Sequence, residues 1–130
     1  MKLTGLTPNV FTSDLHRSLE FYRGVLGFAV TVTVPDAAPF VFAWLQRDGV
    51  SVFLNDLEAA RHEDPNVPFV VGQSGISMFI HLEGVEELWS QVKDRAPVVM
   101  PLKQQWYGMT EFSVADPDGY VITFGERKGE

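Results

Sequence analysis

The sequence predicts an α+β fold made of two tandem copies of one unit, in which a strand and a helix are followed by three strands. Three observations lead to this prediction. Apolar residues alternate along short segments rich in Val, Phe and Thr, which is typical of strands. Helical spacing of apolar residues occurs in each half of the chain, and so does a turn that ends in Asp-Gly, at residues 48–49 and 118–119.

The length and composition fit one folded domain. With 130 residues the chain can form one hydrophobic core, and its hydrophobic content of 45% is that of a globular protein. The absence of cysteine excludes disulfides, thiolate metal sites and a cysteine nucleophile. No apolar run is long enough to span a membrane and the first residues do not resemble a signal peptide, so we expect a cytoplasmic protein. The net charge of −7 argues against nucleic acid as a partner and favours neutral or cationic ligands.

We divide the single domain, residues 1–130, into module one at about 1–56, a connector at about 57–75 and module two at about 76–130. The connector contains prolines and favours at most a turn of helix near its start. A connector of this length either caps a pocket or simply crosses between the modules.

Module one contains a predicted helix between strands. Ser13 or Asp14 suits the N-cap of this helix, and Gly27 suits its C-terminal stop. Its core face comprises Leu15, Leu19, Tyr22 and Leu26. The strands predicted around it cover residues 3–11, 28–34, 40–45 and 50–54.

Module two repeats the pattern, with a helix over residues 83–95 and strands at residues 76–82 and 98–102. The core face of the helix comprises Val85, Leu88, Trp89 and Val92. A hairpin over residues 112–124 closes the chain, because Asp116-Pro117-Asp118-Gly119 has the residues of a tight turn. One face of the hairpin is expected in the core and consists of Phe112, Val114, Tyr120, Ile122 and Phe124.

An offset of 70 residues relates the two modules. It superposes the Asp48-Gly49 turn on Asp118-Gly119 and the first helix face on the second. It also pairs Leu6 with Ile76, Val10 with Ile80, Phe42 with Phe112, Val52 with Ile122 and Leu54 with Phe124. We therefore expect the repeats to pack as one pseudo-symmetric unit.

Strand alternation assigns the side chains to two sheet faces. The face expected against the helices contains Leu6, Val10, Ile76, Met78 and Ile80. The opposite face contains Thr7, Asn9, Phe11, Ser51, Phe53, Ser77, Phe79, His81, Val121 and Thr123. These hydroxyl, amide and phenyl groups are unlike the Lys, Glu and Arg of a solvated sheet face. A half-buried concave surface that binds a small molecule or a second subunit explains them best.

Two segments resemble the vicinal oxygen chelate superfamily, which includes glyoxalase I, extradiol dioxygenases and bleomycin-resistance proteins. Residues 13–22 with residues 24–28 resemble the signature of its first module. Trp106-Tyr107-Gly108, Glu111-Phe112 and the turn at residues 116–119 resemble the second, particularly in the bleomycin-resistance branch. The resemblance spans nearly the whole chain. It implies paired βαβββ modules that form a curved, half-open mixed sheet around a cavity, with the helices on the outer face, often in a homodimer.

The same resemblance argues against the metal-dependent enzymes. Those members supply one His or Glu from each of four strands, and the matching positions here are Thr7, Phe53, Ser77 and Thr123. A catalytic metal site needs about three His or carboxylate donors, so we expect no metal, no cofactor and no catalytic residue. A new metal site formed by His81, Glu111 and a third donor is the alternative. Thr110 replaces a basic residue common before the Glu-Phe pair, which leaves the identity of the ligand open.

The residues expected to bind a ligand are Thr7, Asn9, Phe53, Ser77, Phe79, Trp106, Tyr107, Glu111 and Thr123. Trp106 and Tyr107 suit a stacking platform for a planar ligand, or else they pack beneath a loop or at a dimer contact. Glu111 suits a cationic group, or else it is solvated or paired at an edge strand. The remaining residues are expected to orient or surround the ligand. Alternatively, their polar groups form hydrogen bonds with the backbone, or their side chains belong to the ordinary core.

Two classes of function remain open. The favoured one is a metal-free, bleomycin-resistance-like protein that sequesters a ring-bearing ligand, neutral or cationic, in the concave pocket of a homodimer. The alternative is an enzyme of the same fold, either a lyase or dioxygenase with relocated metal ligands or a metal-independent isomerase. In both classes the natural ligand can also be another metabolite, and the modules can pair within one chain or swap between two.

Overall fold

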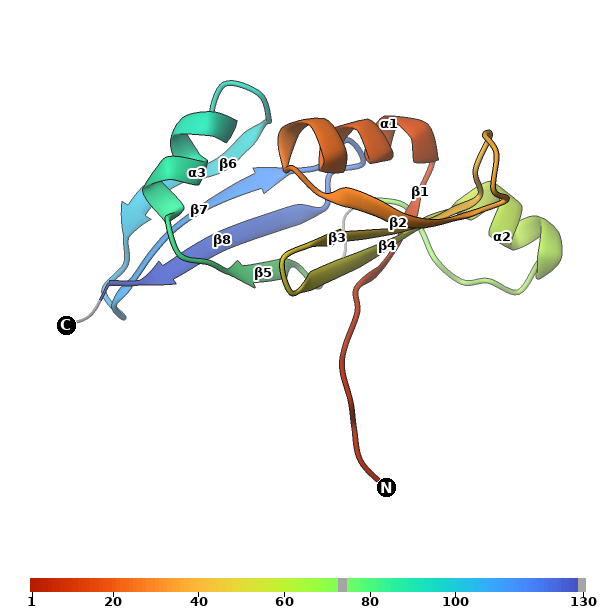
Figure 1. Cartoon of the computed structure of the whole chain (residues 1–130), viewed down its shortest axis with the longest axis horizontal. Coiled ribbons are helices and arrows are strands. Elements are labelled where there is room, and N and C mark those ends of the chain that lie inside the picture. The colour runs from red at the N-terminus through yellow and green to blue at the C-terminus, as the bar shows by residue number, and fades with distance from the viewer. Residues whose placement is uncertain (73–74, 129–130) are drawn as a thin grey trace. The chain divides into compact units, whose positions relative to one another are not determined.

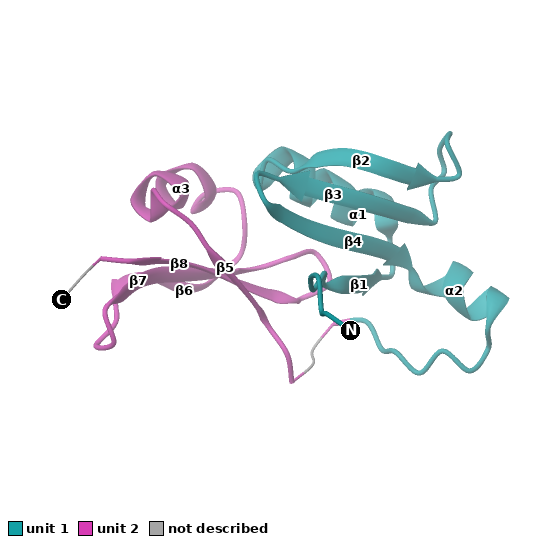
Figure 2. Ribbon diagram, turned by 60° about the horizontal axis from the view of Figure 1, so that its bottom comes forward, with its two compact units in different colours: residues 1–71 teal, residues 72–130 magenta. Residues whose placement is uncertain are grey.

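The computed structural model describes residues 1–72 and 75–128, which belong to two compact units, Met1–Val71 and Gly72–Glu130 (Figure 2). Each unit contains one four-stranded mixed sheet with a helix against one face (Figure 1). The predicted α+β class with two βαβββ modules is therefore confirmed. Within the described residues no helix is long and apolar enough to cross a membrane.

Unit 1 has the strand order β1-β4-β3-β2, in which β1 and β4 are parallel and the other neighbours are antiparallel. Its elements in chain order are β1 (Asn9–Thr12), α1 (Leu15–Glu20), the π-helical turn η1 (Phe21–Val25), β2 (Ala29–Val34), β3 (Phe42–Arg47), β4 (Val50–Asp56) and α2 (Leu57–Glu63). The first strand is shorter than predicted, whereas the predicted helix is covered by α1 and η1 together. Helix α2 occupies the part of the connector where a helical turn is expected.

Unit 2 repeats this topology with the strand order β5-β8-β7-β6, again with one parallel pair, β5 and β8. Its elements are β5 (Met78–His81), α3 (Val85–Val92), β6 (Val98–Gln104), β7 (Met109–Ala115) and β8 (Val121–Arg127). The parallel pair needs a crossover, and in both units the helix between the first two strands provides it.

The start of α1 is set by Asp14, whose carboxylate accepts a hydrogen bond from the N–H of Arg17 at 3.1 Å. All four residues of the predicted core face are buried, namely Leu15, Leu19, Tyr22 and Leu26. Two polar residues share this core: the hydroxyls of Thr12 and Ser18 are fully buried and lie 2.8 Å apart. This hydrogen bond removes the cost of burying either hydroxyl alone.

The β7–β8 hairpin has the predicted register. Its buried pairs are Phe112 with Phe124 and Val114 with Ile122. The carboxylate of Asp116 holds the turn, because it accepts hydrogen bonds from the N–H groups of Asp118 and Tyr120 at 2.9 and 3.0 Å. Gly119 has φ 94°, a left-handed conformation that favours glycine. The turn residues thus act as the sequence predicts.

Two residues predicted to contact the helices are instead exposed. Leu6 and Ile76 are 96% and 81% exposed, because β1 begins only at Asn9 and β5 only at Met78. Figure 1 shows that the chain before β1 extends away from the sheet of unit 1. The apolar residues that alternate before β1 and β5 therefore do not form part of these strands.

The prediction that Phe42 is the counterpart of the core residue Phe112 is wrong. Phe42 is half-buried and pairs with Asn55 on the sheet face away from α1, whereas its neighbour Ala43 is fully buried. The reason is turn length. In unit 1, the loop of the hairpin has two residues, because Arg47 pairs with Val50. In unit 2, the loop has three residues between Asp116 and Tyr120, whose backbone N–H and carbonyl are hydrogen-bonded. The extra residue changes the offset by one on the first strand of the hairpin and reverses which side chains face inward.

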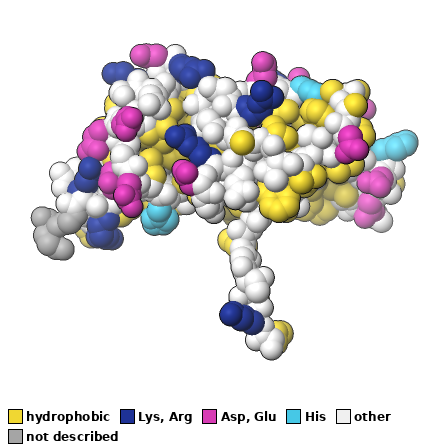
Figure 3. Space-filling view, viewed as in Figure 1, with side chains coloured by type: hydrophobic (Ala, Val, Ile, Leu, Met, Phe, Trp, Pro, Cys, Tyr) yellow, Lys and Arg dark blue, Asp and Glu magenta, His cyan; other side chains and the backbone are white. Residues whose placement is uncertain are grey.

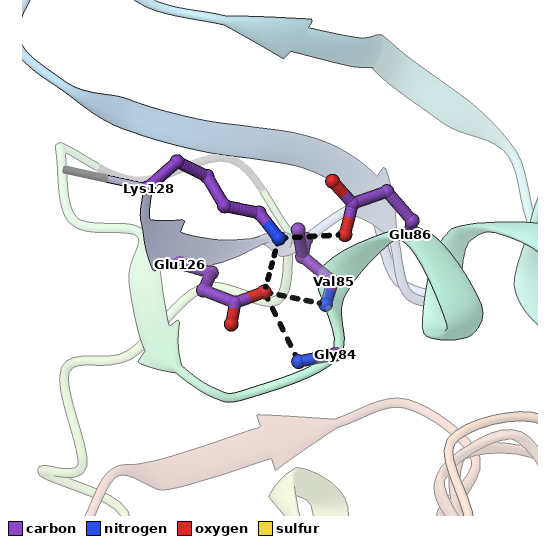
Figure 4. Close-up of polar contacts among 5 residues, drawn as sticks. All are labelled: Gly84, Val85, Glu86, Glu126 and Lys128. Carbon is purple, nitrogen blue, oxygen red and sulfur yellow. Dashed lines mark hydrogen bonds and ion pairs between the residues drawn. The ribbon is translucent and has the colours of Figure 1, made fainter. Parts of the chain in front are cut away.

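Glu126 on β8 joins the sheet of unit 2 to the start of α3 (Figure 4). Its Oε1 accepts hydrogen bonds from the N–H groups of Gly84 and Val85, each at 3.0 Å. Gly84 has no side chain to cap the helix, so Glu126 satisfies these free amides instead. Lys128 Nζ lies 3.3 Å from Glu126 Oε1 and 3.0 Å from Glu86 Oε1. The pKa of Glu126 is lowered, mainly by the hydrogen bond from the Val85 amide and further by the Gly84 amide and Lys128. Together these interactions outweigh the partial desolvation of the carboxylate, which raises the pKa.

We expect Glu126 to contribute to the acid sensitivity of the fold. Because its pKa is lower in the folded than in the unfolded state, the ionised group stabilises the fold above the unfolded pKa, and this contribution is lost as the pH falls through the folded value. Glu126→Gln keeps an acceptor oxygen but loses the charge. This variant should have a lower midpoint of thermal unfolding at neutral pH. Its midpoint should also fall less than that of wild type when the pH is lowered to about pH 3.

Circular dichroism melts at several pH values measure both effects. Glu83→Gln is the matched control, since Glu83 is an exposed carboxylate beside the same helix. It should leave the pH profile of wild type unchanged. Equal profiles for Glu126→Gln and wild type would contradict the role assigned to Glu126.

Candidate functional site

The face of the unit 1 sheet away from α1 carries three aromatic side chains, which we call the aromatic cluster: Phe42 and Trp44 of β3 and Phe53 of β4. The ring of Phe53 lies 5.3 Å from that of Phe42 and 5.6 Å from that of Trp44. All three are half-buried. Hydrophobic side chains gather over β2 to β4 in the space-filling view (Figure 3). Unit 1 therefore presents a ring-lined sheet face rather than a charged one.

Polar groups on the same face satisfy one another. Trp44 Nε1 donates a hydrogen bond to Ser51 Oγ at 3.2 Å. The side-chain amide of Asn55 donates to the side-chain oxygen of Asn9, which orients both amides beside the aromatic cluster. Near β1, the connector contributes Phe69, whose ring stacks on Phe11 at 4.4 Å. The connector thus covers one part of this face, as the capping alternative requires.

The corresponding face of unit 2 carries smaller groups. Ser113 Oγ and Thr123 Oγ1 lie 2.7 Å apart, so the two hydroxyls share a hydrogen bond across β7 and β8. Phe79 of β5 is 43% exposed and lies over Gly125 of β8. A Cβ atom at Gly125 would come 2.5 Å from Phe79 Cζ, so the absence of a side chain at this position allows the ring to lie flat on the sheet.

Glu111 and Tyr107 form the most polar contact of this face. The hydroxyl of Tyr107 donates a hydrogen bond to Glu111 Oε1 at 2.6 Å, a short distance typical of a charged acceptor. This hydrogen bond, followed by desolvation and the negative charge of Glu111, raises the pKa of Tyr107. Trp106 is 93% exposed and its ring stands nearly perpendicular to that of Tyr107. Trp106 and Tyr107 therefore do not form one flat platform, and Trp106 is the more exposed of the two rings.

A shallow cleft of about 410 Å³ lies at the other end of the same unit. Its lining consists of Gly72, Gly75, Ile76, Ser77, Gly119, Tyr120 and Val121. Ser77 is the only predicted ligand-binding residue among these lining residues. Burial raises the pKa of Tyr120, the largest side chain of the cleft.

The predicted ligand-binding residues are divided between the two units. Unit 1 holds Thr7, Asn9 and Phe53, and only the last two lie within strands of its open face. Unit 2 holds Ser77, Phe79, Trp106, Tyr107, Glu111 and Thr123. Within unit 2, Tyr107 contacts Glu111 and Thr123 contacts Ser113, whereas Ser77 lies before β5 at the cleft. Glu111 and Thr123 share the open face with Phe79, because their register partners on β8 and β5 are Gly125 and Phe79.

The residues at the expected metal positions do not fit a divalent metal. The Phe53 ring packs between Phe42 and Trp44 and offers no donor atom. The Thr123 hydroxyl is already hydrogen-bonded to Ser113. Neither Thr7 nor Ser77 supplies a carboxylate or an imidazole. Among residues 1–72 and 75–128, no three His, Asp or Glu side chains gather closely enough to hold a metal ion, and the suggested pair of His81 and Glu111 has no third donor there.

Phe42, Trp44 and Asn55 of the unit 1 open face are absent both from the predicted ligand-binding residues and from the predicted open face. Their signal is present in the sequence. Counting outward from Asp48-Gly49 as a two-residue hairpin loop pairs Trp44 with Phe53 and Phe42 with Asn55, as in the structure. The uniform offset between the modules concealed this pairing.

Comparisons with known proteins agree with this architecture. The family described as the Glyoxalase/Bleomycin resistance protein/Dioxygenase superfamily matches residues 6–124. A bleomycin resistance protein of Geobacillus stearothermophilus is 30% identical over 127 residues, which cover 90% of this chain and 92% of that protein. A protein of unknown function from Agrobacterium tumefaciens has a similar structure, with a TM-score of 0.79, 20% identity and coverage of 97% of this chain and 95% of the other. TioX from a Micromonospora species has a TM-score of 0.77 at 19% identity, with coverage of 95% and 98%.

We expect Gly125 and Phe79 to be energetically coupled. Gly125→Ala places a methyl group against the Phe79 ring and Met109 Cε, and overpacking of this kind costs about 1–3 kcal/mol of unfolding free energy. Phe79→Ala removes the ring, so the same Gly125→Ala change in that background should cost clearly less. Urea unfolding of the two single variants and the double variant completes the cycle. Additive losses would contradict the contact between Gly125 and Phe79.

Proposed function

This chain belongs to the Glyoxalase/Bleomycin resistance protein/Dioxygenase superfamily, and from that premise we propose that it is a metal-free binding protein that sequesters a small, ring-bearing ligand. The observation that carries this proposal is the composition of the open faces. They bear rings, hydroxyls and amides, and Thr7, Phe53, Ser77 and Thr123 occupy the positions where the superfamily's enzymes are expected to supply metal ligands.

The aromatic cluster is the proposed main contact for the ligand. Its three rings are half-buried and mutually packed, so they lose little side-chain entropy when a planar ligand stacks on them. The neighbouring amides of Asn9 and Asn55 are held by their own hydrogen bond and are positioned to orient polar groups of the ligand. Pockets of this kind, apolar with a few fixed polar groups, are typical of small-molecule sites.

The relative from Geobacillus is a bleomycin resistance protein, and we propose the same role of antibiotic resistance here. Resistance by binding requires no chemistry, since the protein only has to lower the free concentration of the drug. The acidic surface, with a net charge of −7, favours a cationic ligand through long-range attraction. The metal-dependent or metal-independent enzyme remains the competing outcome of the tests below.

We expect metal-free bleomycin to quench the tryptophan fluorescence of this protein at micromolar concentrations. Trp44→Ala removes one wall of the aromatic cluster and should weaken binding by about tenfold, which is close to 1.4 kcal/mol. Trp89→Phe is the matched control, because Trp89 packs against the core residue Phe112 beneath α3 and should leave the affinity unchanged. Isothermal titration calorimetry gives the affinity of each variant independently of its fluorescence.

Two results would contradict the proposal. The absence of quenching and of heat at micromolar bleomycin would remove this drug as the ligand. Stoichiometric Fe, Mn, Ni or Zn in protein purified without chelator would replace the metal-free binding protein with an enzyme whose metal ligands have moved. Metal analysis by mass spectrometry separates the two function classes before any substrate is known.

We also expect a homodimer. Val30, Val32 and Val34 of β2 are 36%, 41% and 48% exposed, and an edge strand with apolar side chains and free backbone groups is readily covered by a second copy. Size-exclusion chromatography with light scattering should give twice the chain mass of 14.5 kDa. Val32→Lys should shift the protein toward the monomer, and a wild-type mass of one chain would refute the expectation.

A further inference from the structure

Glu111 is a carboxylate in a place where a carboxylate is costly. It lies near the middle of β7 and is only 5% exposed. Its register partners are Gly125 on β8, which offers no side chain, and Lys103 on β6. A charged group that is taken out of water at such a position requires partners for both of its oxygens.

Only one oxygen of Glu111 has such a partner. Oε1 accepts the hydrogen bond from Tyr107, whereas Oε2 is buried and has no hydrogen-bond partner among residues 1–72 and 75–128. A buried acceptor without a partner is rare in native proteins and calls for an explanation, such as backbone strain, a functional role, or a bound ion or water. Other polar side chains of the two open faces form hydrogen bonds in pairs: Trp44 with Ser51, Asn55 with Asn9, and Ser113 with Thr123.

The cations of unit 2 do not neutralise Glu111. In the part of the chain that the structure describes, neither Lys103 nor Arg127 forms an ion pair with it. Lys103 is exposed, and Arg127 donates instead to the backbone carbonyl of Tyr107 at 3.3 Å. The negative charge of Glu111 therefore lies on the open face without a cationic partner among the described residues.

We propose that Glu111 is the counter-ion for an amidinium or primary ammonium group of the bound ligand, with Oε2 accepting the N–H of that group while Tyr107 holds Oε1. This inference rests on the proposed binding function and names the chemical class of its ligand. It requires a cation with N–H donors on a ring-bearing molecule. A neutral ligand would leave the charge of Glu111 uncompensated, and an anion would be repelled by it.

The surroundings of Glu111 suit this role. Tyr107 is 42% exposed and lies in the turn between β6 and β7, so its hydroxyl holds Oε1 of Glu111 from a residue that is itself open to solvent. Trp106, beside it, is almost fully exposed and offers a ring face to the aromatic part of the same ligand. Phe79 supplies a second ring close to Gly125, the register partner of Glu111. Rings next to a carboxylate are what an aromatic amidine requires for stacking and charge pairing together.

The proposal predicts opposite effects on stability and on binding. Glu111→Met replaces the buried charge with an apolar side chain of similar length, and Glu111→Gln removes only the charge. We expect Glu111→Met to raise the midpoint of thermal unfolding, because a buried group with an unsatisfied oxygen is replaced by one that needs no partner. Both variants should lose the preference for a cation.

The test compares 2-naphthamidine with its uncharged counterpart 2-naphthamide by isothermal titration calorimetry. Wild type should bind the amidine at least about tenfold more tightly than the amide, as expected for a charge-assisted hydrogen bond. In Glu111→Gln and Glu111→Met the ratio should fall to about one. Glu83→Gln, which removes an exposed carboxylate and the same unit of net charge, should keep the wild-type ratio.

An unchanged ratio in both Glu111 variants would overturn the inference, because the preference would then come from the acidic surface as a whole. A lowered unfolding midpoint for Glu111→Met would also count against it, since Glu111 would then be a structural residue. If wild type binds neither compound, this inference fails, and the proposed binding function is decided separately by the bleomycin titration. If it binds both equally, the binding function stands and only the role of Glu111 is lost.

Discussion

The alternation of side chains along the strands is the constraint on which the rest of this structure depends. In each unit one helix, α1 or α3, packs on the sheet and covers only one of its faces, so every second residue of each strand is committed to the core and its neighbours to the open face. The fully buried residues Ala43, Leu45, Val52 and Leu54 of unit 1 illustrate the first set. The aromatic cluster, which alternates with them, is the second set, and no other face of the sheet is available for a site.

This constraint explains how far the sequence predicts the fold and the site. The helix faces, the Asp116 turn and the register of β7 with β8 depend on local patterns, and the sequence predicts them correctly. The error at Phe42 arose because the offset between the modules changes by one residue at a turn, and a change of one residue reverses a strand's two faces. The exposure of Leu6 depends on where pairing with β4 begins, which no local pattern specifies. The Glu111–Tyr107 contact likewise needs the turn geometry of residues 105–108, although both residues belong to the predicted set.

Two glutamates of unit 2 show that the two faces of the sheet differ in how many partners they provide for a carboxylate. Glu126 faces α3, and its Oε1 receives two backbone amides and Lys128, so its charge serves the fold. Glu111 lies on the opposite face and, within residues 1–72 and 75–128, has one partner for its two oxygens. The stability of the protein gains from the first arrangement and loses from the second. A chain that keeps a costly carboxylate on its open face is consistent with a use for that carboxylate outside the fold, which is the basis for assigning it to a ligand.

The replacement of metal-ligand positions also changes what the open face can offer a small molecule. A metal would bind one oxygen-rich group strongly and would fix its position by coordination. Under the proposed function, Thr123 is paired with Ser113 and Phe53 is packed among aromatic rings, so these two positions provide shape and apolar surface where a metal site would provide a Lewis acid. Affinity must then come from many weak contacts over a larger area, which favours a ligand with several rings over a small polar substrate. Under the proposed function, the charge of Glu111 is the directional contact that unit 2 offers, and it would orient a ligand that stacks on the exposed rings of the same unit, Trp106 or Phe79.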